Sequence, residues 1–559
     1  MQRKVLLMQE EFGWACYKLN DKVLWFKGYL LTTNYHKIFI QLDALTKKKF
    51  LLISDFQRIL NRTKGHFAFV FYWDDNVFAS VDKVRSIPIC YLNNSQHQIV
   101  SNNVFLLKEF AGLDDSSLLE SSALEIAMSG YTIGSKTLCK NLYQLTAGEC
   151  LLISQNELKK YFYYTYSPWK VDYRNKDELK TQMTDCLVKS FEDLIESVGA
   201  RQVVVPLSAG SDSRLVASAL KYLGYKNVLC FAYGSYDNYE TQTSRNVAKR
   251  LGYSWVNVPL TLKSQKLFFD SKEFEDYCNT VDIFASTPYM QDVSAVGWLK
   301  NNKIISDDAV FVNGNTGDFI SGGHIPLSLK KESFGFTSSR KIYDDAWDDF
   351  LEKHFSLWGA LRSKDNDNAI KNSLNALLLQ REVPDIQDLN KLHGLFECLE
   401  YLGRQSKYII NMQRSYDFYG YSWRVPLWSD QMLGFWEGVP RNYKLNQNLY
   451  KGVLKENNWG GVWDNVPVNS GKVGSNSLIF ARFISKVAFF PLGVDSWHAF
   501  ERRVFQYLLD DTAHSSIVPY YKVLFDRRGQ RSWVSWLTEK YLNNKGFEDI
   551  SNEFPRRNK

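Results

Sequence analysis

The chain lacks several patterns that would assign it to a familiar class. Its eight cysteines are spread over 559 residues, with no Cys-x-x-Cys pair and no cysteine–histidine cluster at zinc spacing. This spacing argues against a zinc motif and predicts reduced thiols rather than a disulfide framework. Basic and aromatic residues do not gather into a nucleic-acid site, and a net charge of +7 is modest for this length. We therefore expect a globular protein that does not bind nucleic acid.

Long apolar runs are also missing. The N-terminal residues Met1 to Lys4 lead into only a short apolar stretch, so the sequence predicts no secretory signal. The most membrane-like segment, 478–494, contains Arg482, Lys486 and Pro491 and is too short to span a bilayer. A half-buried helix is favoured there over an amphipathic helix on a membrane surface. We expect no transmembrane segment and a cytoplasmic protein.

A chain of 559 residues is long enough for two or more domains, and its pattern changes near residue 169. Before that point, period-two alternation and turn pairs predict β-rich layers. The expected strands are 23–30, 37–41, 66–73, 77–81, 87–92 and 148–153. After a helical segment at 177–198, strands and helices alternate at 203–207, 213–223, 228–233, 239–251 and 255–258. This alternation predicts a parallel α/β sheet, and the segments after 343 are mostly helical.

The loop Ser208–Ser213 lies between the expected strand 203–207 and the helix that follows. Backbone N–H groups and the positive end of a helix dipole would meet there, which predicts an anion site. The loop lacks the lysine of a Walker A phosphate loop and carries Asp212 instead. An acid beside phosphate implies a bridging cation such as Mg²⁺. The ordinary alternative, a Ser/Gly-rich turn, is disfavoured by the flanking strand and helix.

The same loop, Ser208-Ala209-Gly210-Ser211-Asp212-Ser213, resembles the PP-loop of ATP pyrophosphatases, which hold the pyrophosphate of ATP and release it as AMP forms. Segment 309–319 is similar to the second nucleotide motif of asparagine synthetases. Segments 419–427 and 451–455 resemble two further motifs of that family, in the same order and with similar spacing. The chain therefore resembles the asparagine synthetase family.

This resemblance implies two domains. Segments 65–69 and 82–91 resemble the family's glutamine-hydrolysing half, so residues 1–168 are expected to form a glutaminase-like domain, an Ntn-hydrolase-like αββα sandwich. Residues 169–559 are expected to form an adenine-nucleotide α-hydrolase-like (PP-loop) parallel α/β ligase domain with a helical C-terminal part. The family's glutaminases use a cysteine exposed by removal of Met1. Gln2 stands there and the first cysteine is Cys16, so we expect no glutaminase activity.

The resemblance also implies roles for individual residues. The expected ATP-binding residues are Leu207, Ser208, Gly210, Asp212, Ser213, Tyr233, Asn313 and Gly314, with Tyr233 bordering adenine. Asp212 and Asp318 would share Mg²⁺, although for Asp318 alone a helix N-cap is the ordinary alternative. Lys451 would stabilise negative charge in the transition state, against the alternative of a solvated surface lysine. Asn315, where asparagine synthetases have a glutamate, is assigned to catalysis with Lys451, whereas His66 and His324 receive no role.

The reaction implied by the family is ATP-dependent amide formation that yields AMP and pyrophosphate. A substrate carboxylate would form an acyl-adenylate, which ammonia or another amine then attacks. Asn315, Phe319 and Ser422 replace three acids of the family motifs, which favours a carboxylate other than free aspartate. Segment 314–326 resembles homologues associated with bacterial surface polysaccharides, so a sugar carboxylate is the favoured substrate.

Several alternatives stay open. Asparagine synthesis proper and intramolecular amide formation, as in lactam or lasso-peptide synthesis, use the same chemistry on other acids. A non-catalytic nucleotide-binding scaffold is the alternative from a different class. The ammonia could be delivered by a separate protein, and a homodimer is left open.

Overall fold

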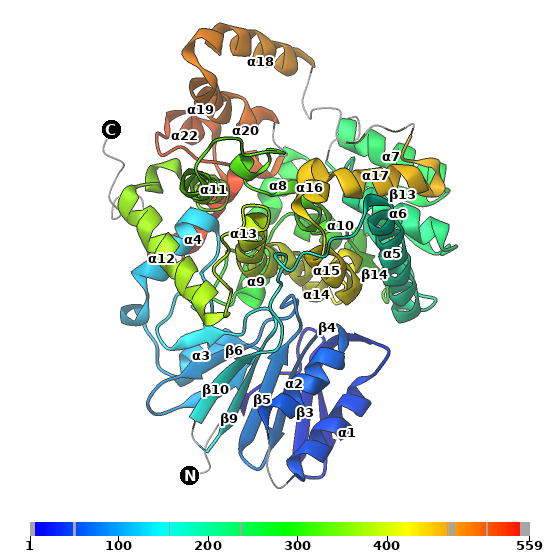
Figure 1. Cartoon of the computed structure of the whole chain (residues 1–559), viewed down its shortest axis with the longest axis vertical. Helices are drawn as coiled ribbons and strands as arrows, with labels where there is room; N and C mark the ends of the chain where they lie inside the picture. The colour runs from blue at the N-terminus through cyan, green and yellow to red at the C-terminus, as the bar shows by residue number, and fades with distance from the viewer. Residues whose placement is uncertain are drawn as a thin grey trace.

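The structure, a computed structural model, describes residues 6–48, 52–155, 157–234, 238–464, 466, 468, 476–509 and 512–547. Two β-sheets form the N-terminal part, and a parallel sheet surrounded by helices forms the rest (Figure 1). The expectation that rests on Gln2 lies outside the described residues.

The larger N-terminal sheet has six antiparallel strands in the order β10-β9-β5-β4-β3-β2. They are β2 (Ala15–Leu19), β3 (Lys22–Leu31), β4 (Lys64–Trp73), β5 (Asn76–Val81), β9 (Glu149–Ser154) and β10 (Glu157–Phe162). The smaller sheet has the order β1-β7-β6-β8. Its strands are β1 (Leu6–Leu7), β6 (Cys90–Asn93), β7 (Gln98–Ser101) and β8 (Leu142–Gln144).

Alternation along β4 explains how these layers stack. Phe67, Phe69 and Phe71 share one apolar cluster with residues of α1 (Tyr35–Thr46) and α2 (Ile53–Arg62). The intervening Ala68 and Val70 belong to a second cluster, which contains the smaller sheet and α4 (Glu120–Ser129). Because successive side chains of a strand point to opposite faces, this pattern buries both faces of the large sheet. The expected αββα sandwich is confirmed.

One expected strand is wrong. Residues 37–41 belong to helix α1, not to a strand. The side chain of Asn34 caps this helix by accepting a hydrogen bond from the backbone N–H of Lys37. Ile38, Phe39 and Leu42 are buried at helical spacing against the large sheet, and a five-residue apolar segment is too short to distinguish this period from alternation.

The second sheet is entirely parallel, with the order β13-β12-β11-β14-β15. Its strands are β11 (Val203–Pro206), β12 (Val228–Tyr233), β13 (Ser254–Val258), β14 (Val310–Val312) and β15 (Ser422–Arg424). The first helices packed on it are α5 (Lys176–Val198), α6 (Ser211–Tyr222) and α7 (Tyr239–Leu251). The predicted alternation of strands and helices is thus confirmed, with β12 and α7 at the expected bounds.

The strand order places a switch point beside β11. The chain continues from β11 to β12 on one side, whereas β14, much later in the sequence, pairs with its other side through Val203 and Val310. Ligands of such sheets bind outside the carboxyl ends of the strands at this point. The loops that follow β11 and β14 are therefore held next to each other.

Helices make up most of the remaining chain. They include α3 (Val104–Phe110), α8 (Leu262–Phe269), α9 (Lys272–Val281), α10 (Val293–Asn301), α11 (Ser339–His354), α12 (Lys364–Gln380), α13 (Leu392–Glu400), α14 (Gln413–Phe418), α15 (Asp430–Glu437), α16 (Arg441–Lys444), α17 (Asn448–Asn457), α18 (Asn476–Phe489), α19 (Val494–Val504), α22 (Tyr520–Phe525) and α23 (Trp533–Asn543). Over the described residues, none of the helices combines the length and apolar character needed to cross a membrane.

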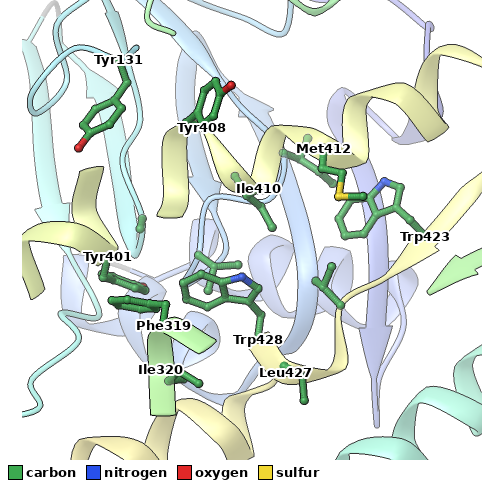
Figure 2. Packing of buried hydrophobic residues seen from close by; sticks show 14 of the residues in the cluster. Tyr131, Phe319, Ile320, Tyr401, Tyr408, Ile410, Met412, Trp423, Leu427 and Trp428 are labelled. Carbon is green, nitrogen blue, oxygen red and sulfur yellow. The ribbon is translucent and has the colours of Figure 1, made fainter. Parts of the chain in front are cut away.

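One apolar cluster joins the N-terminal sandwich to the parallel-sheet region. Tyr131 of the sandwich belongs to the same cluster as Phe319, Tyr401, Tyr408 and Trp428 of the second region (Figure 2). Polar contacts cross the same boundary, because Arg85 donates to the carbonyl of Ser406 and Lys27 pairs with Asp417 at 2.9 Å. The two regions are thus packed through a shared core, and the division at residue 168 stays a prediction.

Candidate active site

The loop after β11 is closed by its own side chains. The hydroxyl of Ser213 accepts a hydrogen bond from the N–H of Ser208 at 3.0 Å, and the Ser208 hydroxyl accepts one from the N–H of Gly210 at 3.1 Å. Helix α6 begins directly after Gly210. The loop is therefore ordered in the shape of a small-residue turn that leads into a helix N-terminus, which suits an anion.

The loop after β14 approaches it so closely that only glycine fits at two positions. A Cβ atom on Gly314 would lie 2.4 Å from the backbone carbonyl carbon of Asp212. A Cβ on Gly317 would lie 2.5 Å from the carboxyl carbon of the same aspartate. Between them, Thr316 has a φ of +86°, a left-handed conformation that is strained for a β-branched residue. The close approach of the two loops thus depends on glycine at these two positions.

Asp212 lies where the loops meet. Its carboxylate accepts hydrogen bonds from the backbone N–H of Asp318 at 2.9 Å and from the hydroxyl of Tyr450 at 2.7 Å. Burial, together with the nearby charge of Asp318, raises the pKa of Asp212 to about 7. Two carboxylates therefore approach one spot, and the charge of His324 offsets only part of the rise in the pKa of Asp212.

Asp318 is held from its other side by a histidine. His324 Nε2 lies 3.1 Å from the Asp318 carboxylate, and its Nδ1 lies 2.5 Å from Glu400. Glu400 also contacts His354 Nε2 at 3.1 Å and accepts a hydrogen bond from Gln405 at 2.8 Å. Although desolvation would raise the pKa of Asp318, the hydrogen bond and charge of His324 lower it. Asp318 is thus kept ionised at the open side of the site.

These groups surround a cavity of about 630 Å³ at the carboxyl ends of β11, β12 and β14. Nine of the eleven predicted site residues line it: Leu207, Ser208, Asp212, Ser213, Tyr233, Asn313, Gly314, Asn315 and Asp318. Gly210 and Lys451 are not part of the lining. Gly210 is nevertheless the N-cap of helix α6 in the first loop. Lys451 is therefore the predicted site residue that lies farthest from its expected place.

Lys451 lies on α17, next to Tyr450. Its ammonium donates to the carbonyl of Asn446 at 3.0 Å, and the side chain is exposed. The pKa of Lys330 is lowered mainly by desolvation and also by the charge of Lys451. These two lysines are therefore near each other. Lys353 is close enough to Asp318 for their charges to interact, while burial lowers the pKa of this lysine to about 8. Cations therefore gather on the side of the site where Asp318 lies.

The wall around Asn315 is neutral. Its side-chain amide lies 3.0 Å from the sulfur of Met412, and the Thr316 hydroxyl lies 3.5 Å from the Gln405 amide oxygen. Phe319, at a position where the family motif has an acid, points into the apolar cluster with Tyr401 and Trp428 (Figure 2). This part of the cavity offers amides, a hydroxyl and a thioether to a ligand.

The far side of the cavity holds a buried acid that sequence reasoning missed. Asp292 accepts hydrogen bonds from the hydroxyls of Tyr233 at 3.0 Å and Tyr416 at 2.9 Å. Burial raises its pKa to about 6, although both hydroxyls act in the opposite direction. Tyr233 thus lies at the end of β12 with its ring beside the cavity and its hydroxyl fixed.

The N-terminal sandwich offers no comparable site at its first cysteine. Cys16 lies on β2, and desolvation raises its pKa. Burial raises the pKa of Cys90 to about 12. His66 is buried and bonded to the hydroxyl of Tyr29 at 2.6 Å, which agrees with giving it no role. His324, by contrast, contacts the predicted metal ligand Asp318, and its sequence position gave no signal of this.

The residues present fit a magnesium–nucleotide complex. In the described ranges, no group of three or more His, Cys, Asp or Glu residues could hold a metal ion. Mg²⁺ typically binds through one or two carboxylates and takes its other ligands from phosphates and water. Asp212 and Asp318 supply such a pair, and the raised pKa of Asp212 marks a place where a cation would be stabilised. These two residues would hold the ion beside the phosphates.

Fold and site together define an α/β domain whose candidate active site lies at the switch point of a parallel sheet. Residues 187–457 match the family model described as Asparagine synthase. This part of the chain is therefore an asparagine synthase domain. The recognition made from the motifs is confirmed.

Other comparisons add less. No curated protein matches the chain. Among solved structures, the allosteric regulatory enzyme of purine biosynthesis has 11% sequence identity and a TM-score of 0.18, over 60% of each chain. The glutamine phosphoribosylpyrophosphate amidotransferase from B. subtilis, complexed with ADP and GMP, has 10% identity and a TM-score of 0.18 over 61% of this chain and 75% of that one. The fold assignment rests on the sheet topology above.

Proposed function

We propose that the protein joins a substrate carboxylate to ammonia or another amine and converts ATP to AMP and pyrophosphate. The observation that carries this proposal is the meeting of Asp212 and Asp318 across two glycine-bearing loops at the sheet's switch point. ATP would lie with its phosphates against the Ser208 loop and its adenine near Tyr233. Bound Mg²⁺ would neutralise phosphate charge and help orient the triphosphate.

The reaction has two steps. A carboxylate oxygen of the substrate forms a bond to the α-phosphorus, and the bond from that phosphorus to pyrophosphate breaks. The amine then attacks the acyl carbon, AMP leaves, and the nitrogen loses a proton. A cavity of about 630 Å³ would hold both partners in alignment.

Lysines near the phosphate end would act on the departing pyrophosphate. Tyr450 donates to Asp212, so the start of α17 lies against the site although Lys451 itself is exposed. Rotation of the Lys451 side chain away from the Asn446 carbonyl would bring an ammonium toward the phosphates. Replacement of Lys451 with Met should therefore abolish turnover and leave folding intact.

For the acid, we propose a sugar carboxylate. Asn315, Gln405 and Thr316 present amide and hydroxyl groups at one end of the cavity, and such groups hydrogen-bond to sugar hydroxyls. Arg404 lines the same cavity, and its guanidinium would bind a carboxylate through two parallel hydrogen bonds. The amine would be ammonia, delivered from solution or by a separate protein.

ATP–pyrophosphate exchange tests this function. Purified protein is incubated with labelled pyrophosphate, ATP, Mg²⁺ and one acid at a time, from hexuronic acids to aspartate. We expect exchange with a hexuronic acid, AMP as the nucleotide product, and neither with Lys451→Met. Exchange with aspartate alone would assign asparagine synthesis instead, and ADP as product would exclude the proposed chemistry. Unaltered biological function of an Asp212→Asn protein would indicate a scaffold.

A further inference from the structure

Helix α18 and the short turn after it present an unusual apolar surface. Seven large apolar side chains between residues 480 and 494 are exposed by 53–87%. They are Phe480, Phe483, Ile484, Val487, Phe490, Leu492 and Val494. Exposed apolar residues are ordinary when scattered, but a contiguous group marks an interaction site. We call these seven residues the α18 face.

The orientation of α18 is the reverse of an ordinary surface helix. At 100° per residue, Phe480, Phe483, Ile484 and Val487 occupy a sector about 100° wide. The opposite sector contains Arg482 and Phe489, and it packs on α19. Arg482 donates from Nε to Glu501 at 2.6 Å, and Phe489 stacks on Phe500 at a ring-centre distance of 4.3 Å.

A charged residue thus faces the protein while the apolar sector faces outward. The sequence-based prediction of a half-buried helix is therefore only partly right, because the buried side of α18 is the side that carries Arg482. Figure 1 shows α18 as the outermost element, at the end of the molecule's long axis opposite the N-terminal sheets. An outward apolar sector at such an extremity can meet a large flat surface without collision from the rest of the chain.

The charges near the α18 face indicate what kind of partner surface it would meet. From residue 476 to residue 494 the sequence contains no acidic residue, and its basic residues are Arg482, which pairs with Glu501, and Lys486. Lys486 is exposed at the edge of the apolar sector. Helices with an aromatic and aliphatic face bordered by basic residues lie in the interface of anionic bilayers. Fourteen residues of helix are too few to cross a membrane, so the helix would lie in the membrane plane.

We propose that the α18 face inserts into the surface of a bilayer that contains anionic lipids and thereby holds the protein on the membrane. Phe480, Phe483 and Val487 would enter the boundary between headgroups and acyl chains. Lys486 would remain at the level of the phosphates, because its long side chain can reach back to water. This inference does not depend on the proposed enzymatic reaction.

Sedimentation of the full-length protein with lipid vesicles tests the inference. One vesicle preparation contains phosphatidylcholine and phosphatidylglycerol in equal parts, and the other contains phosphatidylcholine alone. We expect binding to the mixed vesicles, about tenfold stronger than to the neutral ones and weakened by salt. The double variant Phe483→Asp/Val487→Asp should lower binding more than about tenfold. Lys486→Glu should lower it about fivefold.

A matched control changes two exposed leucines elsewhere to aspartate. Leu267 on α8 is 64% exposed and Leu379 on α12 is 81% exposed, and their double variant should bind vesicles like the wild type. Melting temperatures confirm folding, and Lys486→Glu serves if the apolar variant is unstable. Failure of the wild type to bind mixed vesicles would overturn the inference, as would equal losses in the control. A dimer that the Phe483→Asp/Val487→Asp change dissociates, without vesicle binding, would assign the face to a second copy and also overturn it.

Discussion

Each half of the chain places an aspartate near the end of a strand, and the surroundings of the two aspartates differ. Asp82, directly after β5, is 1% exposed and accepts hydrogen bonds from the N–H groups of Phe67, Val84 and Ser86 at 2.8–3.2 Å. The hydroxyl of Ser86 also donates to it. Asp212, in the second half, accepts from Tyr450 and from the backbone of Asp318 and faces a cavity that a second carboxylate also borders.

From this difference we expect a structural role for Asp82 and a ligand-binding role for Asp212. The protein supplies every donor that Asp82 contacts, and these donors fix the turn between β5 and β6. At Asp212 the protein brings the second carboxylate of Asp318 close beside a cavity, which leaves a need that a cation such as Mg²⁺ would meet.

Asp212→Asn should give the largest effect. The amide keeps the size of the side chain but removes the charge that would bind the cation, so pyrophosphate release should fall about 1,000-fold. The melting temperature should change little, because the substitution also removes repulsion from Asp318. Rates within a few-fold of wild type would contradict the role of Asp212 in the site.

Gly317→Ala should have the next largest effect. The added methyl group would lie 2.5 Å from the Asp212 carboxyl carbon and displace it, and activity should fall about 100-fold, as for other misplacements near 1 Å. Gly452→Ala is the matched control, since a Cβ there meets no atom within 4 Å. That control should keep full activity and gain about 0.5–1 kcal/mol of stability, because alanine is the better helix former. Equal activities of the two variants, measured in parallel, would show that the loops do not need this close approach.

Asp82→Asn should act on stability and leave the chemistry intact. The asparagine amide has one acceptor oxygen fewer than the carboxylate, and its NH₂ group would point toward backbone N–H groups that are themselves donors. Each buried donor that is left unpaired costs roughly 1–3 kcal/mol. We expect a loss of about 3 kcal/mol in the free energy of unfolding. Urea denaturation measures this loss, and assays well below the melting temperature should show near-normal pyrophosphate release. An effect on turnover as severe as that of Asp212→Asn would erase the distinction between the two aspartates.

Changing Cys16 should have the smallest effect. Since desolvation raises the pKa of its thiol, Cys16 is a poor nucleophile, and Cys16→Ala should leave ammonia-dependent activity unchanged. Glutamine should not replace ammonia in either protein. Glutamate release in step with amide formation would show that the N-terminal sandwich retains glutaminase chemistry.

The sequence predicted the parallel sheet better than the sandwich, for a physical reason. Buried parallel strands are continuous apolar runs, so β12 and the helix α7 after it have the expected bounds. In the sandwich, residues 37–41 form part of α1 because tertiary contact with the large sheet decides between two periods that a short segment fits equally well. The reversed packing of α18 also depends on contacts with α19 that the segment itself does not reveal.

The site shows the same limit. Asn313 follows β14 directly, and Asp212 and Asp318 lie a few residues after β11 and β14, so local pattern and motif sufficed to find them. Tyr450 lies 238 positions from Asp212 along the chain, and Glu400 reaches the site only through His324. Such partners depend on which distant helices the fold brings together, and no local pattern encodes them.

We propose that Asp212 and Asp318 hold Mg²⁺ with ATP at the junction of the two loops. Isothermal titration calorimetry of ATP into the full-length protein, with Mg²⁺ and then with a chelator, is the decisive measurement. We expect one ATP per chain with Mg²⁺, and binding at least about tenfold weaker without Mg²⁺ or in Asp212→Asn. Equal affinity under all three conditions, or no ATP binding with Mg²⁺ present, would contradict it.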